Sequence, residues 1–445
     1  MKLFATDVFT PNDFPEHTYV ARAGEDLERK LERAVATPKV VISISGPSKS
    51  GKTVLVEKVV GKDSMILVSG AEVQSGDDLW SRVLSWMDVP SSVVEQTTKS
   101  SGHRFGAEAS GKAGIVGVEA SGKTSYDHTR GTATAVTETR SDDGLARVIR
   151  DIANSTFVVF LDDFHYIPEN GRTDVARHIK AGAERGIRIC VATVPHRADD
   201  VVRTNHELRG RLAQVDTSFW TVEELAQIAI AGFSKLLVDI TPQQAMRLAE
   251  EACGSPQLMQ RICLDVCFDL GIRHEQTEKT AINLEGTRLH SILEQSSTHA
   301  DFGTMVANMH QGPKTRGTER RVHNLIDGSE GDVYRVLLLA LAHGNPTMVL
   351  PYNLLMERIE AVCTGEPPAA SSIVQACRQL DAIAKRIAPT ERVLEWTDQE
   401  LTGTLNIVNP YFLFYLRCSR KLQTLASIKP NAGSDHAPRS EDAGD

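Results

Sequence analysis

The chain has 445 residues, of which 41% are apolar and 24% charged, a globular composition with enough length for two or three domains. Its formal net charge of −9 argues against a general polyanion-binding protein, although a local basic face is compatible with this total. No run of about 18 apolar residues is present, so we expect no transmembrane helix and no membrane partner. The first residues lack the apolar region of a signal peptide.

The seven cysteines predict a cytoplasmic protein with reduced, buried thiols, because their number is odd and their neighbours are apolar. Cys263 and Cys267 lie four residues apart on a predicted helix, as metal ligands can. No second pair with zinc spacing lies near them, so we interpret both as core residues.

An extended arm and a helix are predicted within residues 1–37, and a phosphate-binding motif follows. Residues 40–61 contain a buried strand, a loop and an amphipathic helix, and the loop GPSKSGKT fits the P-loop pattern G-x-x-x-x-G-K-[ST]. Its backbone N–H groups can surround a phosphate at the positive end of the helix. We expect Lys52 to bind the β- and γ-phosphates of ATP and Thr53 to bind Mg²⁺. The other nucleotide-binding candidates in the loop are Gly46, Ser48, Lys49, Ser50 and Gly51.

Residues 117–124, GVEASGKT, match the same pattern. The sequence EASGK occurs twice in this region, which indicates a short local duplication. The stretch that follows has no helical apolar period, so no helix N-terminus would face a phosphate there. We therefore assign the P-loop to residues 46–53, and separate substitutions of Lys52 and Lys123 test this choice.

A strand is predicted at residues 65–68 and a helix at 77–87. Residues 97–143 then interrupt the pattern, because they are rich in Ser, Gly, Thr and Ala. Parts of this segment, such as 132–139, alternate like paired strands. We interpret it as an inserted loop or β-hairpin, either a flexible excursion or a contact surface for a partner.

The next buried strand, residues 157–161, ends in Asp162 and Asp163. This pattern is typical of the second nucleotide-site motif, the Walker B strand. One carboxylate there can coordinate Mg²⁺, and its neighbour can orient or deprotonate the attacking water. We interpret the nearby His165 as a packing or hydrogen-bonding residue.

A helix at about 172–185 leads to a further strand, 187–193. Its last residue, Thr193, stands where related ATPases keep a side chain that hydrogen-bonds the attacking water; a threonine without such a role is the alternative. Strands that alternate with helices predict a doubly wound parallel α/β sheet with ligand at the carboxyl ends of the strands. The P-loop, the paired aspartates and Thr193 all fall at such ends.

Arg211, and Arg209 as a second choice, could reach a γ-phosphate in cis or across a subunit interface; an exposed arginine without such a role is the alternative. A short strand follows at residues 213–216. Residues 221–271 predict a small helical lid whose first helix opens with a capping box, Thr221 and Glu224.

Residues 298–330 are polar and locally basic and predict a linker. Three helices and two strands between residues 331 and 408 predict a winged-helix module. Nine basic and nine acidic residues balance between 331 and 425, which weakens a DNA-binding interpretation, because phosphate contacts need a positive surface. The predicted domains are an N-terminal arm and helix (1–37), a P-loop ATPase core (38–219) with the insertion, a helical lid (220–297), the linker (298–330), a winged-helix-like domain (331–425) and a disordered tail (426–445).

These motifs together resemble the AAA+ and STAND-type P-loop ATPases, and most closely the bacterial and archaeal ATPases related to origin-recognition proteins. The resemblance rests on GPSKSGKT, FVVFLDD, the Thr193 strand, Gly210-Arg211, the lid and the winged helix. It implies that Lys52 and Thr53 bind ATP and Mg²⁺ and that Asp162 serves the metal. It also implies that an arginine near 211 senses the γ-phosphate and that Pro256, in a Gly-x-Pro sequence, contacts the nucleotide.

Two residues depart from the AAA+ pattern. Most AAA+ members have glutamate where this chain has Asp163, and the paired aspartates usual in the STAND group imply slow, switch-like hydrolysis. Gln257 occupies the expected place of a lid arginine, with Arg261 one turn later. We therefore do not expect strong motor activity.

The sequence leaves three functions open. The first is an ATP-controlled switch that self-associates or binds a protein partner in its ATP form and is reset by slow hydrolysis to ADP. The second is a DNA-acting ATPase of the loader, initiator or transposition-regulator kind, which the basic residues at 314–321 favour and the neutral module disfavours. The third is a non-hydrolysing nucleotide-binding scaffold.

Overall fold

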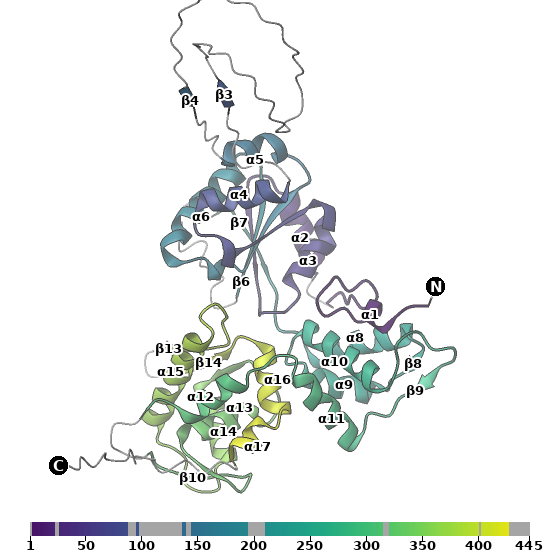
Figure 1. The fold of residues 1–445 in the computed structure, drawn as a ribbon, viewed down its shortest axis with the longest axis vertical. Helices are drawn as coiled ribbons and strands as arrows, with labels where there is room; N and C mark the ends of the chain where they lie inside the picture. The colour runs from purple at the N-terminus through teal and green to yellow at the C-terminus, as the bar shows by residue number, and fades with distance from the viewer. Residues whose placement is uncertain are drawn as a thin grey trace, which may run out of the picture.

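The computed structural model describes residues 2–22, 26–87, 95–97, 136–138, 144–194, 210–314, 320–399 and 402–426. Three bodies are visible in Figure 1: a sheet flanked by helices, a helical lid that carries the N-terminus, and a C-terminal module. Within the described residues, no helix is long and apolar enough to cross a membrane.

The central sheet is parallel throughout, with strand order β2-β5-β6-β1-β7. Because neighbouring strands are parallel, the chain must cross over between them, and helices α3, α4 with α5, and α6 make the connections from β1 to β2, from β2 to β5 and from β5 to β6, as in a doubly wound fold. The predicted fold class is therefore confirmed. The strands are β1 (Val41–Ser45), β2 (Met65–Ser69), β5 (Val158–Asp162), β6 (Arg188–Thr193) and β7 (Leu212–Asp216).

Alternate residues of the strands enter two separate cores, one on each face of the sheet. Ile42 and Ile44 of β1 are buried beneath one helical layer, whereas Val41 is buried beneath the other. This alternation follows from the period of two of a β-strand. The first layer is α2 (Leu27–Ala36) and α3 (Lys52–Val60), and the second is α4 (Gly76–Trp86), α5 (Gly144–Ile152) and α6 (Glu169–Glu184).

Two short strands mark the ends of the predicted insertion. β3 (Glu95–Thr97) pairs antiparallel with β4 (Val136–Glu138), which agrees with the strand-like alternation expected near residues 132–139. The rest of the insertion, including the second P-loop match at 117–124, lies outside the described residues.

The lid is a helical body that follows β7. Its first helix begins with the predicted capping box: the Thr221 Oγ1 accepts from the Glu224 amide at 3.2 Å, and the Glu224 carboxylate accepts from the Thr221 amide at 2.9 Å. These bonds satisfy two amides at the start of the helix. The lid consists of α8 (Val222–Lys235), β8 (Val238–Asp239), α9 (Pro242–Glu251), α10 (Pro256–Asp269), β9 (Thr280–Ala281) and α11 (Gly286–Ser297).

The N-terminal arm packs on the lid rather than on the sheet. Its helix α1 (Ala5–Val8) is followed by Phe9, which is fully buried with its ring centroid 5.1 Å from that of Phe233. A Cβ on Gly232 would lie 2.2 Å from the Phe9 ring, so the glycine allows this close approach. The second half of the arm also reaches the ATPase core, because the Tyr19 hydroxyl donates to the Glu28 carboxylate of α2 at 2.6 Å.

The predicted linker at 298–330 contains a buried helix, so the prediction of a linker is wrong for this part. In α12 (Gly303–Gln311), Met305, Val306 and Met309 are buried in the core of the C-terminal module. With Phe302 they form the i, i+3, i+4, i+7 stripe of an amphipathic helix, which the polar neighbours obscure in the sequence.

The C-terminal module has a winged-helix arrangement, as predicted. Three helices precede two strands of a small antiparallel sheet with order β12-β14-β13. Short strands β10 (His323–Asn324) and β11 (Glu330–Gly331) precede them. The module's main elements are α13 (Val333–Ala342), β12 (Val349–Pro351), α14 (Tyr352–Val362), α15 (Ala370–Ile387), β13 (Leu394–Gln399), β14 (Thr402–Ile407), α16 (Pro410–Cys418) and α17 (Lys421–Ala426).

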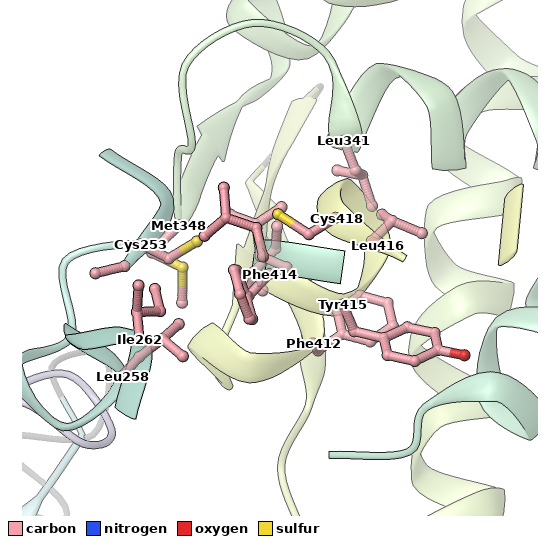
Figure 2. Close-up of a cluster of buried hydrophobic side chains, with 14 of the residues drawn as sticks. Cys253, Leu258, Ile262, Leu341, Met348, Phe412, Phe414, Tyr415, Leu416 and Cys418 are labelled. Atoms are coloured by element: carbon pink, nitrogen blue, oxygen red, sulfur yellow. The ribbon is translucent and has the colours of Figure 1, made fainter. Parts of the chain in front are cut away.

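The lid and the C-terminal module share one continuous apolar core. Figure 2 shows Cys253, Leu258 and Ile262 of the lid facing Phe414 and Met348 of the module, and all five belong to the same buried cluster. A shared core of this kind couples the two bodies mechanically, because packed interiors are close to incompressible.

Candidate nucleotide-binding site

The P-loop lies between the end of β1 and the start of α3 in the geometry that phosphate binding needs. Gly51 has φ of +88°, in the left-handed region, and turns the chain into the helix N-terminus. A Cβ on Gly46 would lie 1.7 Å from the Thr217 Oγ1, so only glycine fits beside β7 at that point. The amides at the start of α3 have no partner within the helix and can bind an anion.

Lys52 occupies the phosphate position of its own loop. The side chain is 6% exposed, and its ammonium donates to the carbonyls of Gly46, at 3.0 Å, and Pro47, at 2.7 Å. Burial lowers the pKa of the Lys52 ammonium, and the nearby Asp162 and Asp163 carboxylates oppose that shift. A bound phosphate would offer this buried cation a full negative charge in place of two carbonyl dipoles.

Thr53 and Asp162 meet at the place where a metal ion would be held. The Thr53 hydroxyl donates to the Asp162 carboxylate at 2.7 Å, although 109 residues separate them in the chain. Hydroxyl and carboxylate oxygens are ligands suited to Mg²⁺, which takes few protein ligands and completes its shell with water and phosphate oxygens.

Asp163 has an unusual backbone conformation and a raised carboxyl pKa. Its φ of 54° places it in the left-handed region, which is uncommon for a residue with a side chain. Burial, and secondarily the Asp162 charge, raises the pKa of the Asp163 carboxyl to about 6, while Lys52 and Lys49 act against this. A carboxylate with a pKa near the working pH is suited to accept a proton.

The loop after β2 packs against the backbone of Asp163. A Cβ on Gly70 would lie 2.4 Å from the Asp163 carbonyl oxygen, so the two backbones touch only because residue 70 is glycine. The 3₁₀ turns Gly70–Glu72 and Phe164–Tyr166 pack against each other here. Gly70 is a site residue that the sequence analysis missed.

Thr193 lies at the carboxyl end of β6, in register with Ser45 at the end of β1. Its carbonyl accepts from the Gly46 amide at 3.1 Å. Its hydroxyl is buried and has no hydrogen-bond partner among the described residues, which is unusual for a buried polar group. A water or phosphate oxygen in the site could supply the missing partner.

The lid touches the P-loop directly. The Ser255 hydroxyl donates to the Lys49 carbonyl at 3.1 Å, and the Trp220 indole donates to the Ser50 carbonyl at 2.9 Å. Pro256 lies next to them, 3.8 Å from where a Cβ on Gly51 would be. Ser255 and Pro256 thus stand at the P-loop, where the Gly-x-Pro sequence was expected.

These elements surround a cavity of about 860 Å³, a size suited to a nucleotide. The P-loop, the paired aspartates, Trp220 and Pro256 line it, and so does the N-terminal arm. The sequence analysis missed the arm, because nothing in its polar sequence shows where it folds. The arm residues on the cavity are Thr10, Pro11, Asn12, Asp13, Phe14, Pro15, Thr18, Tyr19, Val20 and Arg22.

Buried Gln260 of α10 fastens the arm above the site. Its carbonyl accepts from the Thr10 amide at 3.3 Å, and its amide donates to the Thr18 hydroxyl at 2.6 Å. Gln257, in the place expected for a lid arginine, donates to the Asn12 side chain at 3.2 Å. Arg261 is instead bound by Asp265 and His299.

The proposed role of Arg211 in cis is contradicted by the fold. Its carbonyl accepts from the amide of Val41, the first residue of β1, so Arg211 lies at the amino edge of the sheet. Five residues of strand, roughly 16 Å, separate that edge from the P-loop. The exposed guanidinium pairs with Glu184. The two remaining interpretations are a role across a subunit interface and an exposed arginine without a catalytic role. Arg209 lies outside the described residues.

Comparisons with known proteins return solved structures only; no family model and no curated protein matches the chain. It is similar to Cdc6p from Pyrobaculum aerophilum (13% identity, 96% of this chain and 100% of that chain, TM-score 0.41). It is similar to the ORC2 protein from Aeropyrum pernix in its ADPNP–ADP complexes (12% identity, 95% of this chain and 99% of that chain, TM-score 0.48). It is also similar to a Walker-type ATPase of Pyrococcus abyssi (13% identity, 88% of this chain and 95% of that chain, TM-score 0.46). The resemblance stated from the sequence was to proteins of this kind.

Proposed function

We propose that the protein is a P-loop ATPase that binds ATP with Mg²⁺, hydrolyses it slowly in the cytoplasm, and acts as a nucleotide-controlled switch for assembly or partner binding. The observation that carries this proposal is the meeting of two strand ends at one cavity. Lys52 and Thr53 follow β1, Asp162 and Asp163 stand at the end of β5, and all four line the cavity. Thr193 ends the neighbouring strand β6, in register with Ser45 of β1. Reactive groups from separate strands converge in this way at ligand sites of doubly wound sheets.

Each group has a chemical task in this proposal. The α3 amides and Lys52 bind the β- and γ-phosphates, and Lys52 stabilises the charge that develops on the γ-phosphoryl group. Thr53 and Asp162 hold Mg²⁺, which neutralises phosphate charge when bound. Asp163 accepts a hydrogen bond or proton from the attacking water, and the Thr193 hydroxyl orients that water.

The switch is supported by how the lid closes the site. Ser255 and Trp220 bind P-loop carbonyls, and the lid shares its core with the C-terminal module. A change in the P-loop on nucleotide binding is therefore transmitted to the lid, and from the lid to the module. All seven cysteines are free thiols, in keeping with a reducing compartment.

The proposal is tested by nucleotide binding and phosphate release on the full chain. Lys52→Ala should lower ATP affinity by at least about 100-fold, because the buried phosphate loses its cation. Lys123→Ala, in the second P-loop match, is the control and should bind as the wild type does. Asp163→Asn should keep ATP affinity and stop turnover. Wild-type affinity in Lys52→Ala would refute the site, and binding without turnover under all conditions would favour a non-hydrolysing scaffold.

A DNA-acting ATPase is the second candidate, favoured by the winged-helix arrangement and by Arg378, Lys385 and Arg386 on the exposed face of α15. Several basic groups are already paired, however: Arg378 with Asp398 at 2.8 Å, and Lys385 with Asp381 at 2.8 Å. In the basic stretch expected to favour DNA, Arg320 pairs with Asp332 and Arg321 with Glu366. A salt-sensitive gel shift with duplex DNA would establish this function, since phosphate contacts weaken with salt.

A further inference from the structure

Helix α16 of the C-terminal module contacts the lid at one end and the P-loop at the other. Near its C-terminal end, the Arg417 guanidinium binds the Glu251 carboxylate of the lid at 2.8 and 2.9 Å. Near its N-terminal end, the Tyr411 ring faces the P-loop, with the Lys49 ammonium 5.6 Å from the ring centroid. This distance is within the range of a cation–π interaction. A residue of the module therefore belongs to the surroundings of the phosphate site.

The module makes a second, separate contact at the Walker B strand. The Arg392 amide, just before β13, donates to the Tyr166 hydroxyl at 3.3 Å. Tyr166 stands three residues after Asp163, and its ring lies 4.3 Å from that of His165, whose Nδ1 is 3.9 Å from the Asp163 carboxylate. The module thus contacts the P-loop and also the turn that follows the Walker B strand.

Both lysines of the P-loop are engaged with protein groups while the module is docked. Lys52 binds two carbonyls of its own loop, and Lys49, held at φ 59°, faces Tyr411. A triphosphate would bring several negative oxygens to the same loop. Because an ammonium–phosphate pair is stronger than a cation–π pair, bound phosphate would draw Lys49 away from the ring.

We propose that the C-terminal module is docked against the ATPase core beside the nucleotide cavity, an arrangement that we call the docked cover, and that the phosphates of the bound nucleotide compete with Tyr411 for Lys49. The empty protein holds the module through Tyr411 and Arg392, and nucleotide binding loosens both contacts. This inference rests on the proposed function, since it requires nucleotide at residues 46–53. Because the two equilibria are linked, a substitution that weakens docking of the module should raise the affinity for nucleotide by the same factor.

The test is the ATP affinity of the full chain with changes at Tyr411. Tyr411→Leu removes the aromatic face and keeps an apolar side chain of similar size. ATP should then bind about two- to five-fold more tightly, because this factor corresponds to the free energy of a cation–π contact that is exposed or half-buried. Tyr411→Phe keeps the face and is the matched control, with wild-type affinity expected. In a Lys49→Met background, Tyr411→Leu should change nothing further, because the pair is already broken.

Hydrogen exchange of the wild type gives a second measurement that needs no substitution. The amide of Arg392 should exchange faster with ATP than without, because its bond to Tyr166 opens. Unchanged affinity in Tyr411→Leu, or slower exchange at residue 392 with ATP, overturns the proposal of a docked cover. If the wild type binds no nucleotide, the proposed function and the cover both fail. If the wild type binds ATP, Lys52→Ala does not, and Tyr411→Leu has wild-type affinity, the function stands and the cover alone is rejected.

Discussion

The two aspartates at the end of β5 have opposite surroundings although they are adjacent in the chain. Asp162 accepts a hydrogen bond from Thr53 and lies in regular strand. Asp163 is half-buried, in the left-handed region, and its carboxyl has a raised pKa. The contact with Thr53 suits Asp162 to the metal role proposed for it. The raised pKa of Asp163 suits that residue to proton transfer, which needs a group that titrates near the working pH.

The raised pKa of Asp163 predicts how turnover depends on pH. The ionised form is the active one, so phosphate release should be full above pH 7 and fall as pH decreases through about 6. An ordinary aspartate would keep its charge to about pH 4. Turnover should be measured with saturating ATP, and ATP binding determined at each pH. A flat rate between pH 8 and pH 5 would exclude Asp163 as the proton acceptor.

Gly70→Ala should slow turnover without abolishing nucleotide binding. The added Cβ would meet the Asp163 carbonyl oxygen at 2.4 Å, so the end of β5 must shift, and a misplacement of about 1 Å can cost around 100-fold in rate. Gly365→Ala is the control, since no atom lies within 4 Å of its added Cβ. Equal rates in both variants would show that the contact between residues 70 and 163 does not position the carboxylate.

At the scale of elements, the N-terminal arm is the least expected part of the site. It is attached to the lid through buried Phe9 and through the Gln260 side chain, and most of its second half lines the cavity. It also contacts the ATPase core, because the Tyr19 hydroxyl donates to the Glu28 carboxylate of α2. The arm also connects the lid to α2 of the ATPase core through residues 23–26 of the chain.

Phe9→Ala should destabilise the lid by about 3–5 kcal/mol, as truncation of a fully buried phenylalanine does, and weaken ATP binding as the arm detaches. Phe4→Ala is the matched control in the same arm, because the Phe4 side chain is 51% exposed. Thermal unfolding and ATP affinity measure both effects. A wild-type affinity in a destabilised Phe9→Ala protein would show that the arm contributes nothing to nucleotide binding.

At the scale of the whole molecule, the position of Arg211 connects hydrolysis to self-association. The side chain is exposed at the amino edge of the sheet, and only a second subunit could bring a phosphate to it. A finger supplied in trans would make hydrolysis depend on assembly.

Mass photometry should show a larger species with ATP and Mg²⁺ than without nucleotide or with ADP, and Asp163→Asn should hold that species. Arg211→Ala should then reduce turnover in the assembled protein, while exposed Arg185, substituted by alanine, serves as the control. An unchanged mass in all states would refute self-association. The nucleotide state would then have to control the binding of a different partner molecule.

Motifs with a fixed local geometry could be read from the sequence. The P-loop between a strand and a helix, the apolar strand ending in Asp162-Asp163, and the capping box at Thr221 depend on residues close together in the chain, and the structure places each in the expected element. The doubly wound sheet followed from the alternation of such elements. The winged helix followed from its order of helices and strands.

The features decided by tertiary structure all depend on contacts between distant residues. Arg211 lies at the amino edge of the sheet because β7, which it precedes, pairs parallel with β1. Packing buried α12 where the polar sequence had indicated a linker, and it placed the arm at the nucleotide cavity. It also placed Gly70 against Asp163 and Tyr411 against Lys49. Local periodicity specifies which face of an element is apolar, but the partner of that face is chosen only when the whole chain competes for burial.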